Sequence, residues 1–293
     1  MEEAPWCRRD SAGEVIFNGR MWILGGYSPG RLNDVWSSRD GLDWEEVTPA
    51  APWPERNLPG CLVHDDRIWI MGGADSSGVR ALGDVWCSRD GEKWDLVSEK
   101  PPWEPRVAPS VLSFGGRIWI FGGFDIANFH HHSDAWSSED GVQWECACQA
   151  APWGPRAMHS SVVFDGRMWV IGGGIYDTSR PSNTVEDYGD VWASPDGTSW
   201  ERISRGAGWQ ARRFHSSVVY DSRIWIISGY HCGNRNDIWC STNGMDWTEV
   251  EVDPEWSPRH EPMCLVHEGS IWMMGGFGER LFNDIWSARA VSE

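Results

Sequence analysis

Residues 152–200 hold the pattern that decides the fold: PWGPR (152–156), SSVVF (160–164), DG (165–166), RMWVIGG (167–173), DVW (190–192) and SPDGTSW (194–200). Four tryptophans mark this unit, and the same four positions recur in six repeats, of which the last lacks the fourth tryptophan. Three sets of six and one set of five account for all 23 tryptophans of the 293-residue chain. We therefore predict one domain, 1–293, with repeats at approximately 6–52, 53–102, 103–152, 153–208, 209–255 and 256–293.

Each repeat predicts four short antiparallel strands. Asp165-Gly166 and Asp196-Gly197 are two-residue hairpin turns, and the segments beside them are rich in the β-branched and aromatic residues that strands favour. Six sheets of this kind arranged as a ring leave no long exposed sheet edge. The sequence therefore predicts an all-β, six-bladed β-propeller with four antiparallel strands in each blade. The loops between second and third strands, with the connections between repeats, share one rim, which we call the top rim.

The sixth blade is expected to be incomplete. Its fourth tryptophan is missing, and five residues precede Trp6, too few to supply a full fourth strand from the N-terminus. We therefore predict that this blade has three strands.

The repeat resembles the Kelch repeat. The resemblance lies in the Pro-Arg before the first strand, the tryptophan of the fourth strand, and a double glycine after the second strand, at Gly25-Gly26, Gly72-Gly73, Gly122-Gly123, Gly172-Gly173, Gly275-Gly276 and, as a variant, Ser228-Gly229. It covers nearly the whole chain, although the third strand carries tryptophan where Kelch repeats more often have tyrosine. The resemblance implies the propeller fold and leaves the function open.

A second motif, S-x-D-G-x-x-W, recurs between the third and fourth strands at Ser38–Trp44, Ser88–Trp94, Ser138–Trp144, Ser194–Trp200 and, with asparagine for aspartate, Ser241–Trp247. It resembles the Asp-box turn of sialidase propellers, shortened by one residue. Serine and aspartate side chains stabilise such turns through local backbone hydrogen bonds. We therefore predict a structural role for these segments.

Composition narrows the functional classes. The net charge is -18, from 43 acidic and 25 basic residues, which argues against a surface for nucleic acid or for an anionic membrane. The sequence has no apolar run long enough to span a membrane and no leader pattern before Trp6, so we expect a cytoplasmic protein. Cys61 and Cys264 occupy equivalent positions in different blades, too far apart for a disulfide, and are expected to be buried thiols.

An arginine recurs at the top of every first strand, at Arg9, Arg56, Arg106, Arg156, Arg212 and Arg259. Six guanidinium groups near one mouth would attract an anion, and the planar fork of arginine suits a carboxylate or a phosphate. The Kelch resemblance adds that some Kelch domains bind acidic partners through arginines at matching positions. The alternative is that each arginine pairs with a neighbouring acid or carbonyl and holds the connection between repeats.

Residues that break the repeat are the better candidates for function. Three positions after the recurrent arginine, two neighbouring blades carry His159 and His215. Histidine titrates near neutral pH and is the commonest general acid or base, so both are candidate catalytic residues, together with Tyr230 and Glu261. The alternative for both histidines is a structural role, which is frequent at this position in Kelch repeats. Arg213 and His260 are further candidate ligand contacts at the same level.

Residues after the double glycines are expected to face the mouth, where Tyr27, Phe124 and Phe277 would form an aromatic wall. The longest loop between second and third strands, Gly174 to Tyr188, carries Tyr176, Asp177, Arg180, Glu186 and Asp187. Long loops inside a compact repeat are commonly either functional or disordered. We predict that this loop covers the mouth over blades four and five and that Tyr176 contacts the ligand.

The run His130-His131-His132 raises the question of a metal site. Neighbouring side chains of an extended chain point in opposite directions, so at most His130 and His132 could share an ion, with Asp125 or Asp134. This interpretation is weaker than that of a loop without metal. The sequence contains no nucleotide-binding or serine-hydrolase motif, and no cofactor is expected.

Two functional hypotheses remain. In the first, the protein is an enzyme similar to Kelch propellers that isomerise or rearrange anionic substrates without a redox cofactor: arginines hold a carboxylate-bearing small molecule, and a histidine moves a proton for isomerisation, cyclisation or elimination. In the second, the same mouth binds an acidic peptide or a glycan without catalysis. Irregularity of the top rim and the absence of a recognisable adaptor domain favour the first.

Overall fold

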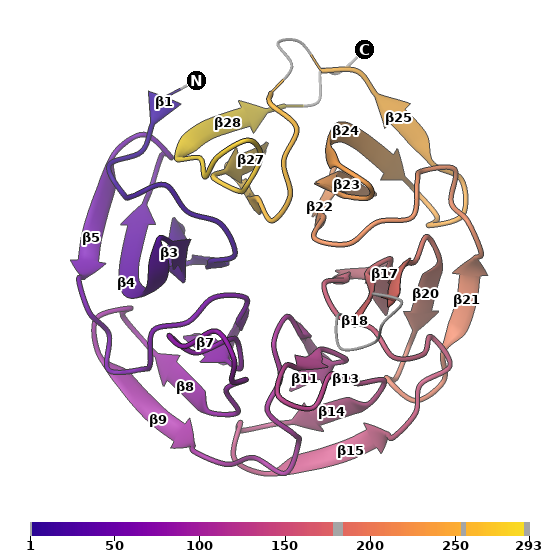
Figure 1. Ribbon diagram of the computed structural model, residues 1–293, viewed down its shortest axis with the longest axis horizontal. Coiled ribbons are helices and arrows are strands. Elements are labelled where there is room, and N and C mark those ends of the chain that lie inside the picture. The colour runs from indigo at the N-terminus through magenta and orange to yellow at the C-terminus, as the bar shows by residue number, and fades with distance from the viewer. Residues whose placement is uncertain (1, 178–183, 253–255, 290–293) are drawn as a thin grey trace.

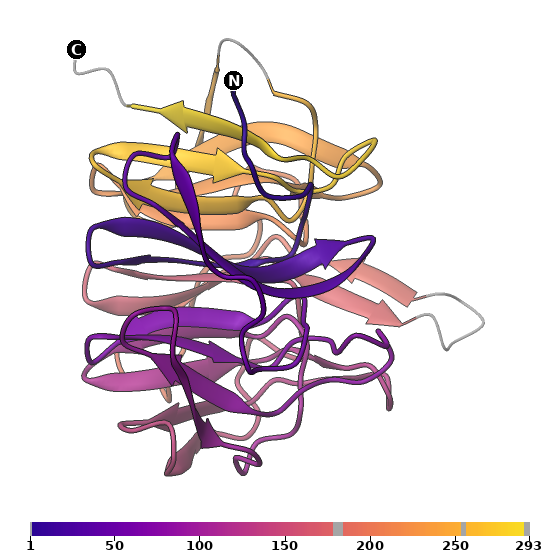
Figure 2. The same ribbon diagram turned by 90° about the vertical axis from the view of Figure 1, so that its left-hand side faces the viewer.

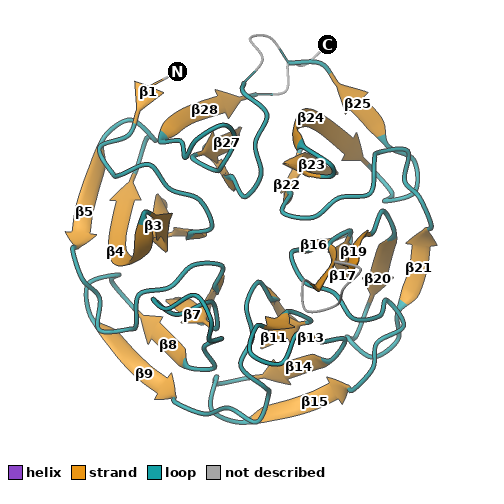
Figure 3. Cartoon of the chain, viewed as in Figure 1, coloured by secondary structure: helices purple, strands orange, loops and turns teal. Residues whose placement is uncertain are grey.

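The computed structural model describes residues 2–177, 184–252 and 256–289. Their regular structure is strand throughout, arranged as six sheets around a central channel (Figures 1 and 3). This confirms the predicted all-β, six-bladed propeller. Among the described residues there is no helix long and apolar enough to cross a membrane.

In each blade the strands follow one another from the channel outward. Blades one to three are formed by β2 (Gly13–Phe17), β3 (Arg20–Ser28), β4 (Gly30–Ser38) and β5 (Trp44–Thr48); by β6 (Gly60–His64), β7 (Arg67–Met71), β8 (Val85–Ser88) and β9 (Trp94–Ser98); and by β10 (Ser110–Phe114), β11 (Arg117–Phe121), β14 (Ala135–Ser138) and β15 (Trp144–Cys148).

Blades four to six are formed by β16 (Ser160–Phe164), β17 (Arg167–Ile171), β20 (Val191–Ser194) and β21 (Glu201–Ser204); by β22 (Ser216–Tyr220), β23 (Arg223–Tyr230), β24 (Asn234–Ser241) and β25 (Thr248–Val250); and by β26 (Met263–His267), β27 (Ser270–Met274), β28 (Asp284–Ala288) and β1 (Glu2–Glu3). Two small hairpins rise from the top rim: β12 (Phe124–Asp125) with β13 (His130–His131), and β18 (Gly174–Asp177) with β19 (Thr184–Asp187). The second projects farther from the ring (Figure 2).

The S-x-D-G-x-x-W segments are turns held by their own side chains, as predicted. In blade one the Ser38 hydroxyl accepts the Gly41 N–H at 2.9 Å, and the Asp40 carboxylate accepts the N–H groups of Leu42 and Asp43, each at 2.9 Å. These bonds hold the pKa of Asp40 below its usual value. The same bonds recur in the next four blades.

The hydrophobic core lies between neighbouring blades, and tryptophans dominate it. Between blades one and two it contains Trp22, Trp53, Trp86 and Trp94. The indoles of Trp53 and Trp94 meet edge to face, with their centroids 5.9 Å apart, a geometry that aromatic pairs favour. Equivalent pairs occur at four other blades. The repeated tryptophans therefore fasten blade to blade.

The ring closes at blade six, where three strands come from the end of the chain, as predicted. The outer edge of β28 pairs with the two residues of β1, Glu2 with Ile285 and Glu3 with Asp284. Asn283 extends this contact, because its side-chain amide donates to the Ala4 carbonyl at 3.0 Å. The N-terminus thus joins the sixth sheet with a two-residue strand.

All eight cysteines are free thiols. Cys61 and Cys264 lie on the inner strands of blades two and six, on either side of blade one. The prediction that these positions do not form a disulfide is confirmed.

The glycine of each S-x-D-G-x-x-W turn lies close to a tryptophan of the neighbouring blade, and a substitution at this glycine tests the packing. A Cβ added to Gly91 would lie 2.1 Å from Trp22 Cζ3, and Gly91 has a φ of +76°. We expect Gly91→Ala to lower the free energy of unfolding by about 2–4 kcal/mol, from overpacking and left-handed strain together. Denaturant unfolding measures this change.

Gly166→Ala is the matched control. Gly166 has a φ of +67°, and an added Cβ would meet no described atom within 4 Å. It should therefore show the strain without the clash, about 1 kcal/mol. Equal losses in the two variants would contradict the packing argument.

Candidate functional site at the channel mouth

A ring of six residues surrounds the mouth of the channel on the top rim. We call it the mouth ring: Ser11, Leu58, Ala108, Met158, Phe214 and Glu261. Each has a left-handed backbone, with φ between 49° and 58°. The N–H of each residue from Leu58 to Glu261 donates to the carbonyl of the mouth-ring residue in the preceding blade, at 2.8–3.4 Å. The same backbone hydrogen bond therefore joins each of these five blades to the one before it.

At the sixth junction, side chains make the contact. The Ser11 hydroxyl lies within hydrogen-bond distance of Glu261 Oε2 and, at 2.7 Å, of Asp10 Oδ1. A hydroxyl has one proton to donate. Both bonds can form together only when one of the two carboxyl groups is protonated and donates to the hydroxyl oxygen. Blades six and one therefore meet through a chain of carboxyl, hydroxyl and carboxyl groups.

Three carboxyl groups gather in this sector of the channel. Burial raises the pKa of Glu261 to about 8, and the nearby charge of Asp10 adds to the effect. Burial also raises the pKa of Glu14 to about 8 and that of Asp10 to about 6. None of the three forms an ion pair within the described part of the chain, and only for Asp10 does a nearby cation, Arg31, partly oppose the effect of burial on the pKa. Glu14 and Glu261 are thus held as neutral acids near neutral pH.

The opposite half of the mouth is apolar. Above blades two to four, Ala74, Val107, Ala108, Phe124 and Ala157 form a buried cluster, against which Leu58 and Met158 of the mouth ring pack. Phe124, predicted as part of an aromatic wall, belongs to this cluster and is buried. The mouth therefore has an acidic side over blades six and one and an apolar side over blades two to four.

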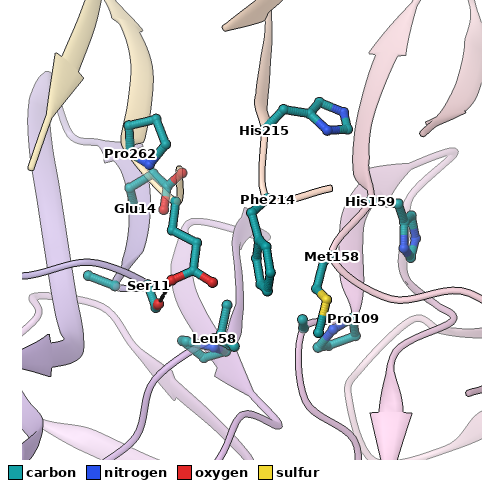
Figure 4. A pocket seen from close by; sticks show the side chains of 13 residues that line it. Ser11, Glu14, Leu58, Pro109, Met158, His159, Phe214, His215 and Pro262 are labelled. Carbon is teal, nitrogen blue, oxygen red and sulfur yellow. Dashed lines mark hydrogen bonds between the residues drawn. The ribbon is translucent and has the colours of Figure 1, made fainter. Parts of the chain in front are cut away.

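The channel between these sides holds two adjoining cavities of about 140 and 210 Å³. In Figure 4 the Phe214 ring lies between Ser11 and Glu14 on one side and Met158 and Pro109 on the other. The upper cavity is similar in size to the roughly 150 Å³ engineered cavity that accepts benzene. It could hold one small molecule or one end of a larger one.

The recurrent arginines do not face the mouth, which corrects the first expectation about them. Their side chains are 0–1% exposed, and each forms two hydrogen bonds with the D-x-W aspartate of its own blade. The pairs are Arg9 with Asp34, Arg56 with Asp84, Arg106 with Asp134, Arg156 with Asp190, Arg212 with Asp237 and Arg259 with Asp284. The contacts agree with the alternative prediction, in which each arginine pairs with a neighbouring acid and carbonyl and holds the connection between repeats.

Each pair is part of a larger bonded unit. Arg106 also donates to the Gly122 carbonyl at 2.8 Å, and its guanidinium carbon lies 5.6 Å from the centre of the Trp103 ring. Asp134 in turn accepts the indole N–H of Trp136 at 2.7 Å. The double glycine, the D-x-W motif and the arginine therefore meet at one point in each blade.

His159 and His215 lie deeper than the mouth ring and are turned away from Glu14 (Figure 4). His215 Nε2 lies 2.8 Å from the Ser160 hydroxyl. Neither ring nitrogen of His159 has a hydrogen-bond partner among the described residues. Burial, followed by the charge of Arg212, lowers the pKa of His215 to about 3, and burial with Arg156 holds the pKa of His159 well below 6.5. Both are therefore neutral. They line the same cavity as Glu261, and no hydrogen bond joins either of them to it among the described residues.

Other predicted residues do converge, above blade five. The His260 ring lies 5.4 Å from the rings of Phe214, Tyr230 and Phe277, and its Nδ1 is 2.6 Å from Asn234 Oδ1. Burial, with the charge of Arg213, lowers the pKa of His260 to about 4. A neutral imidazole inside an aromatic group thus stands beside the acidic side of the mouth.

Arg213 joins this group to the hairpin of blade four. Its guanidinium lies 5.1 Å from the Tyr230 ring and 5.6 Å from the Tyr176 ring, and it pairs with Asp187. His231 also contacts Asp187, at 2.7 Å. The predicted covering loop is therefore a hairpin whose base is bonded to blade five. Arg180 lies outside the described residues.

On blade one, the exposed Tyr27 ring is stacked against Arg31, whose guanidinium lies 5.6 Å away. Arg31 donates to Asn57 Oδ1 at 2.8 Å and pairs with no carboxylate in the described ranges. Its charge opposes the rise in the pKa of Asp10. Arg31 is thus a cation beside the acidic side of the mouth that the sequence did not single out.

The three histidines of blade three do not form a metal site with their neighbours. The rings of His130 and His132 lie 4.9 Å apart. Asp134 is bonded to Arg106, and Asp125 accepts the N–H groups of Ala127 and Asn128. No group of three histidine, cysteine, aspartate or glutamate side chains within the described ranges is arranged to hold an ion.

Glu14 and Ser11 were not predicted from the sequence, although the repeat contains the signal for both. Glu14 is the second residue of an inner strand, where the other blades carry Cys61, Val111, Ser161, Ser217 and Cys264. An ionisable residue at a position that is otherwise small or apolar marks a departure from the scaffold. Ser11 forms its contact with a residue 250 positions away, which a pattern within one repeat cannot reveal.

Removing one recurrent arginine should destabilise the fold. Arg106→Ala leaves Asp134, whose side chain is 17% exposed, without its cation. We expect a loss of about 3–5 kcal/mol in the free energy of unfolding, measured by denaturant titration. Arg167→Ala is the control, because Arg167 is 43% exposed and pairs with an exposed glutamate. It should change stability by less than about 1 kcal/mol, and similar losses in the two variants would contradict the assignment.

Neutral carboxyl groups also predict a pH dependence. Their folded pKa values of about 8 exceed the ordinary value of 4.5, so between pH 6.5 and 8 the folded state binds more protons than the unfolded state. Stability should therefore fall as pH rises through this window. Glu14→Gln should flatten the slope by up to about 1.4 kcal/mol per pH unit. The exposed Glu45→Gln should leave it unchanged, and equal slopes for all three proteins would disprove a protonated Glu14.

Comparison with known proteins agrees with the geometry. The Kelch motif matches residues 155–188, which run from the connection before blade four to the base of its hairpin. A comparison with curated proteins gave no significant match. The chain therefore contains a Kelch motif in blade four and folds as a six-bladed β-propeller.

Proposed function

We propose that the mouth binds a small, carboxylate-bearing molecule and transfers a proton to or from it. The observation that carries this proposal is the Asp10–Ser11–Glu261 chain at the entrance of a cavity of about 140 Å³. Two carboxyl groups that share one proton through a hydroxyl can give a proton and take it back. Pairs of carboxyl groups with separated pKa values serve as acid and base in many enzymes.

The surroundings of this chain support a ligand with two unlike ends. Arg31, whose charge acts on the pKa of Asp10, and Arg213, whose charge acts on that of His260, are the proposed contacts of the anionic end, in place of the recurrent arginines. The apolar cluster across the mouth suits a hydrocarbon or ring. A ligand that is apolar at one end and anionic at the other fits both sides.

Residue roles follow from position. Glu261 is the proton donor, because its raised pKa keeps it protonated, and Asp10, with a pKa of about 6, is the proton acceptor. Ser11 connects them, and Glu14 lines the same cavity as a second neutral acid. His260 and Tyr230 shape the entrance. His159 and His215 line both cavities, but their lowered pKa values keep them neutral, and we assign them no part in this proton transfer.

One observation favours non-catalytic binding as the second candidate. Tyr27, Tyr176 and Phe277 are 36–41% exposed on the top rim. Exposed aromatic rings around a polar mouth are typical of surfaces that bind a peptide or a glycan. In that case the same face would hold an acidic partner, with Arg31 and Arg213 as its charged contacts.

A two-stage experiment tests the main proposal. The protein is first screened against small mono- and dicarboxylates by thermal shift. Ligands that stabilise it are then incubated with the protein in D₂O, and deuterium at their carbon atoms is followed by NMR. We expect at least one carboxylate to bind and to exchange a C–H proton. Glu261→Gln should keep the thermal shift and lower the exchange rate at least about a hundredfold.

Two variants separate binding from chemistry. Arg31→Ala should weaken binding of the same ligand by about tenfold. Glu45→Gln, on the outer surface of blade one, should change neither readout. Absence of stabilisation by any carboxylate would disprove the proposal. Binding without exchange would disprove its catalytic part and leave the binding module.

A further inference from the structure

The outer strand of blade six, within the described residues, is only the two-residue β1, whereas the other five blades have a longer one, and an apolar pocket lies beside the part of β28 that β1 leaves unpaired. Its volume is about 310 Å³. We call it the fourth-strand pocket; among its lining residues are Trp225, Trp256, Trp286, Ile238 and Met273. It lies on the outer side of the ring, away from the mouth, and is lined by none of the mouth residues.

The other five blades show what occupies this place. There, the tryptophan that begins the fourth strand packs edge to face on the tryptophan of the connecting segment, with centroids 5.7–6.1 Å apart. In blade six the connecting tryptophan, Trp256, has Trp286 as its neighbour instead, 6.1 Å away. The core between blades five and six therefore lacks the indole that completes each of the other cores.

The glycine turns give the same picture. In five blades the glycine of the S-x-D-G-x-x-W turn lies against a second-strand tryptophan of the preceding blade, namely Trp272, Trp22, Trp69, Trp119 and Trp169. The sixth such tryptophan, Trp225, has no turn to cover it, because blade six lacks the motif. Instead, Trp225 lines the fourth-strand pocket.

A strand edge is open beside the pocket. In blade one, β4 pairs with β5 so that Ser38 faces Trp44 and Ser37 faces Glu45. The equivalent residues of β28 are Ala288 and Ser287. On its outer side, β28 pairs with β1 through Asp284 and Ile285, and within the described residues nothing pairs with Trp286–Ala288 there. In Figure 1, β28 has the third place in its blade, as β4 and β8 have in blades one and two, and the short β1 lies outside it where those blades have β5 and β9.

Blade six has a cation, Arg289, near the place where the acidic residue of an added outer strand would lie. In three blades, the residue after the fourth-strand tryptophan is a glutamate paired with the first arginine of the second strand: Glu45 with Arg20, Glu145 with Arg117, and Glu201 with Arg167, at 2.8–3.1 Å. In blade six, Ser270 replaces that arginine, and Arg289 Nε donates to the Ser270 hydroxyl at 2.7 Å. Arg289 thus supplies a guanidinium near the usual position, with no carboxylate partner in the described part of the chain.

We propose that the fourth-strand pocket is a docking site for a partner polypeptide, which adds as an outer strand beside β28. The partner inserts a tryptophan between Trp225, Trp256 and Trp286 and places an acidic residue, next in sequence, on Arg289. Strand addition to an open sheet edge is an established mode of peptide recognition, in which the backbone gives affinity and side-chain pockets give selectivity. This inference is independent of the function proposed for the mouth.

The chain itself provides the probe. A peptide of residues 38–48, SRDGLDWEEVT, contains the turn and fourth strand of blade one. Labelled with fluorescein, it is titrated with the full chain, and anisotropy is measured. We expect saturable binding with Kd below about 100 μM, and at least about tenfold weaker binding of the same peptide with W44A.

A charge exchange tests the contact with Arg289. Arg289→Glu should weaken binding of the peptide by about tenfold, and the peptide with E45R should recover affinity for that variant. Circular dichroism and thermal unfolding confirm that Arg289→Glu is folded. Arg167→Glu, on the surface of blade four, is the matched protein control and should bind the peptide as the unmodified chain does.

Three results would overturn the inference. They are absence of saturable binding up to ~1 mM peptide, equal affinity for the W44A peptide, and loss of affinity in Arg289→Glu that E45R does not restore. A dimer of the unliganded chain that the peptide converts to monomers would assign the pocket to a second copy, and would also overturn it.

Discussion

The buried pairing of arginine and aspartate within each blade is the interaction on which the rest of the structure depends. In blade three, Arg106 joins the start of the inner strand to Asp134 at the start of the third strand and to the carbonyl of Gly122 at the end of the second. One guanidinium thereby holds three strand ends at the top rim. Because a buried charge without its partner is strongly destabilising, every blade must keep both residues, and the positions of the loops above them follow.

Around the channel, the residues that build the scaffold differ from the residues that line the mouth. The six arginines belong to the framework, so charge at the mouth comes from residues that differ between blades. Acids gather where the two ends of the ring meet, at Asp10, Glu14 and Glu261, and apolar residues gather on the opposite side. The residues that close the ring between blades six and one are therefore also residues of the mouth. A carboxyl that loses its proton there alters both the hydrogen bonding of the junction and the charge of the channel.

The repeat made most of the fold predictable, because each strand, turn and tryptophan recurs with a fixed spacing. The incomplete sixth blade followed from one missing tryptophan. The arginine ring was misplaced for a reason visible in the same repeat: a charge that recurs in every blade has a partner that recurs too, and the aspartate of D-x-W is that partner. The contact of Ser11 with Glu261 was beyond prediction, since it joins residues 250 positions apart. Tyr230, His260 and Phe277 were expected near the mouth, and their rings do meet there.

The left-handed backbone of the mouth ring has a consequence for how this protein can change. Glycine adopts that conformation without strain, whereas other residues sacrifice roughly 1 kcal/mol or more. All six positions nevertheless carry a side chain: serine, leucine, alanine, methionine, phenylalanine and glutamate. At five of the six junctions the hydrogen bonds use backbone atoms, so the ring tolerates exchange of the side chains of Leu58, Ala108, Met158 and Phe214, whereas the side chains of Ser11 and Glu261 form the sixth junction. The mouth thus presents six different side chains on one repeated backbone conformation. A new ligand preference can arise there by single substitutions that leave the blades intact.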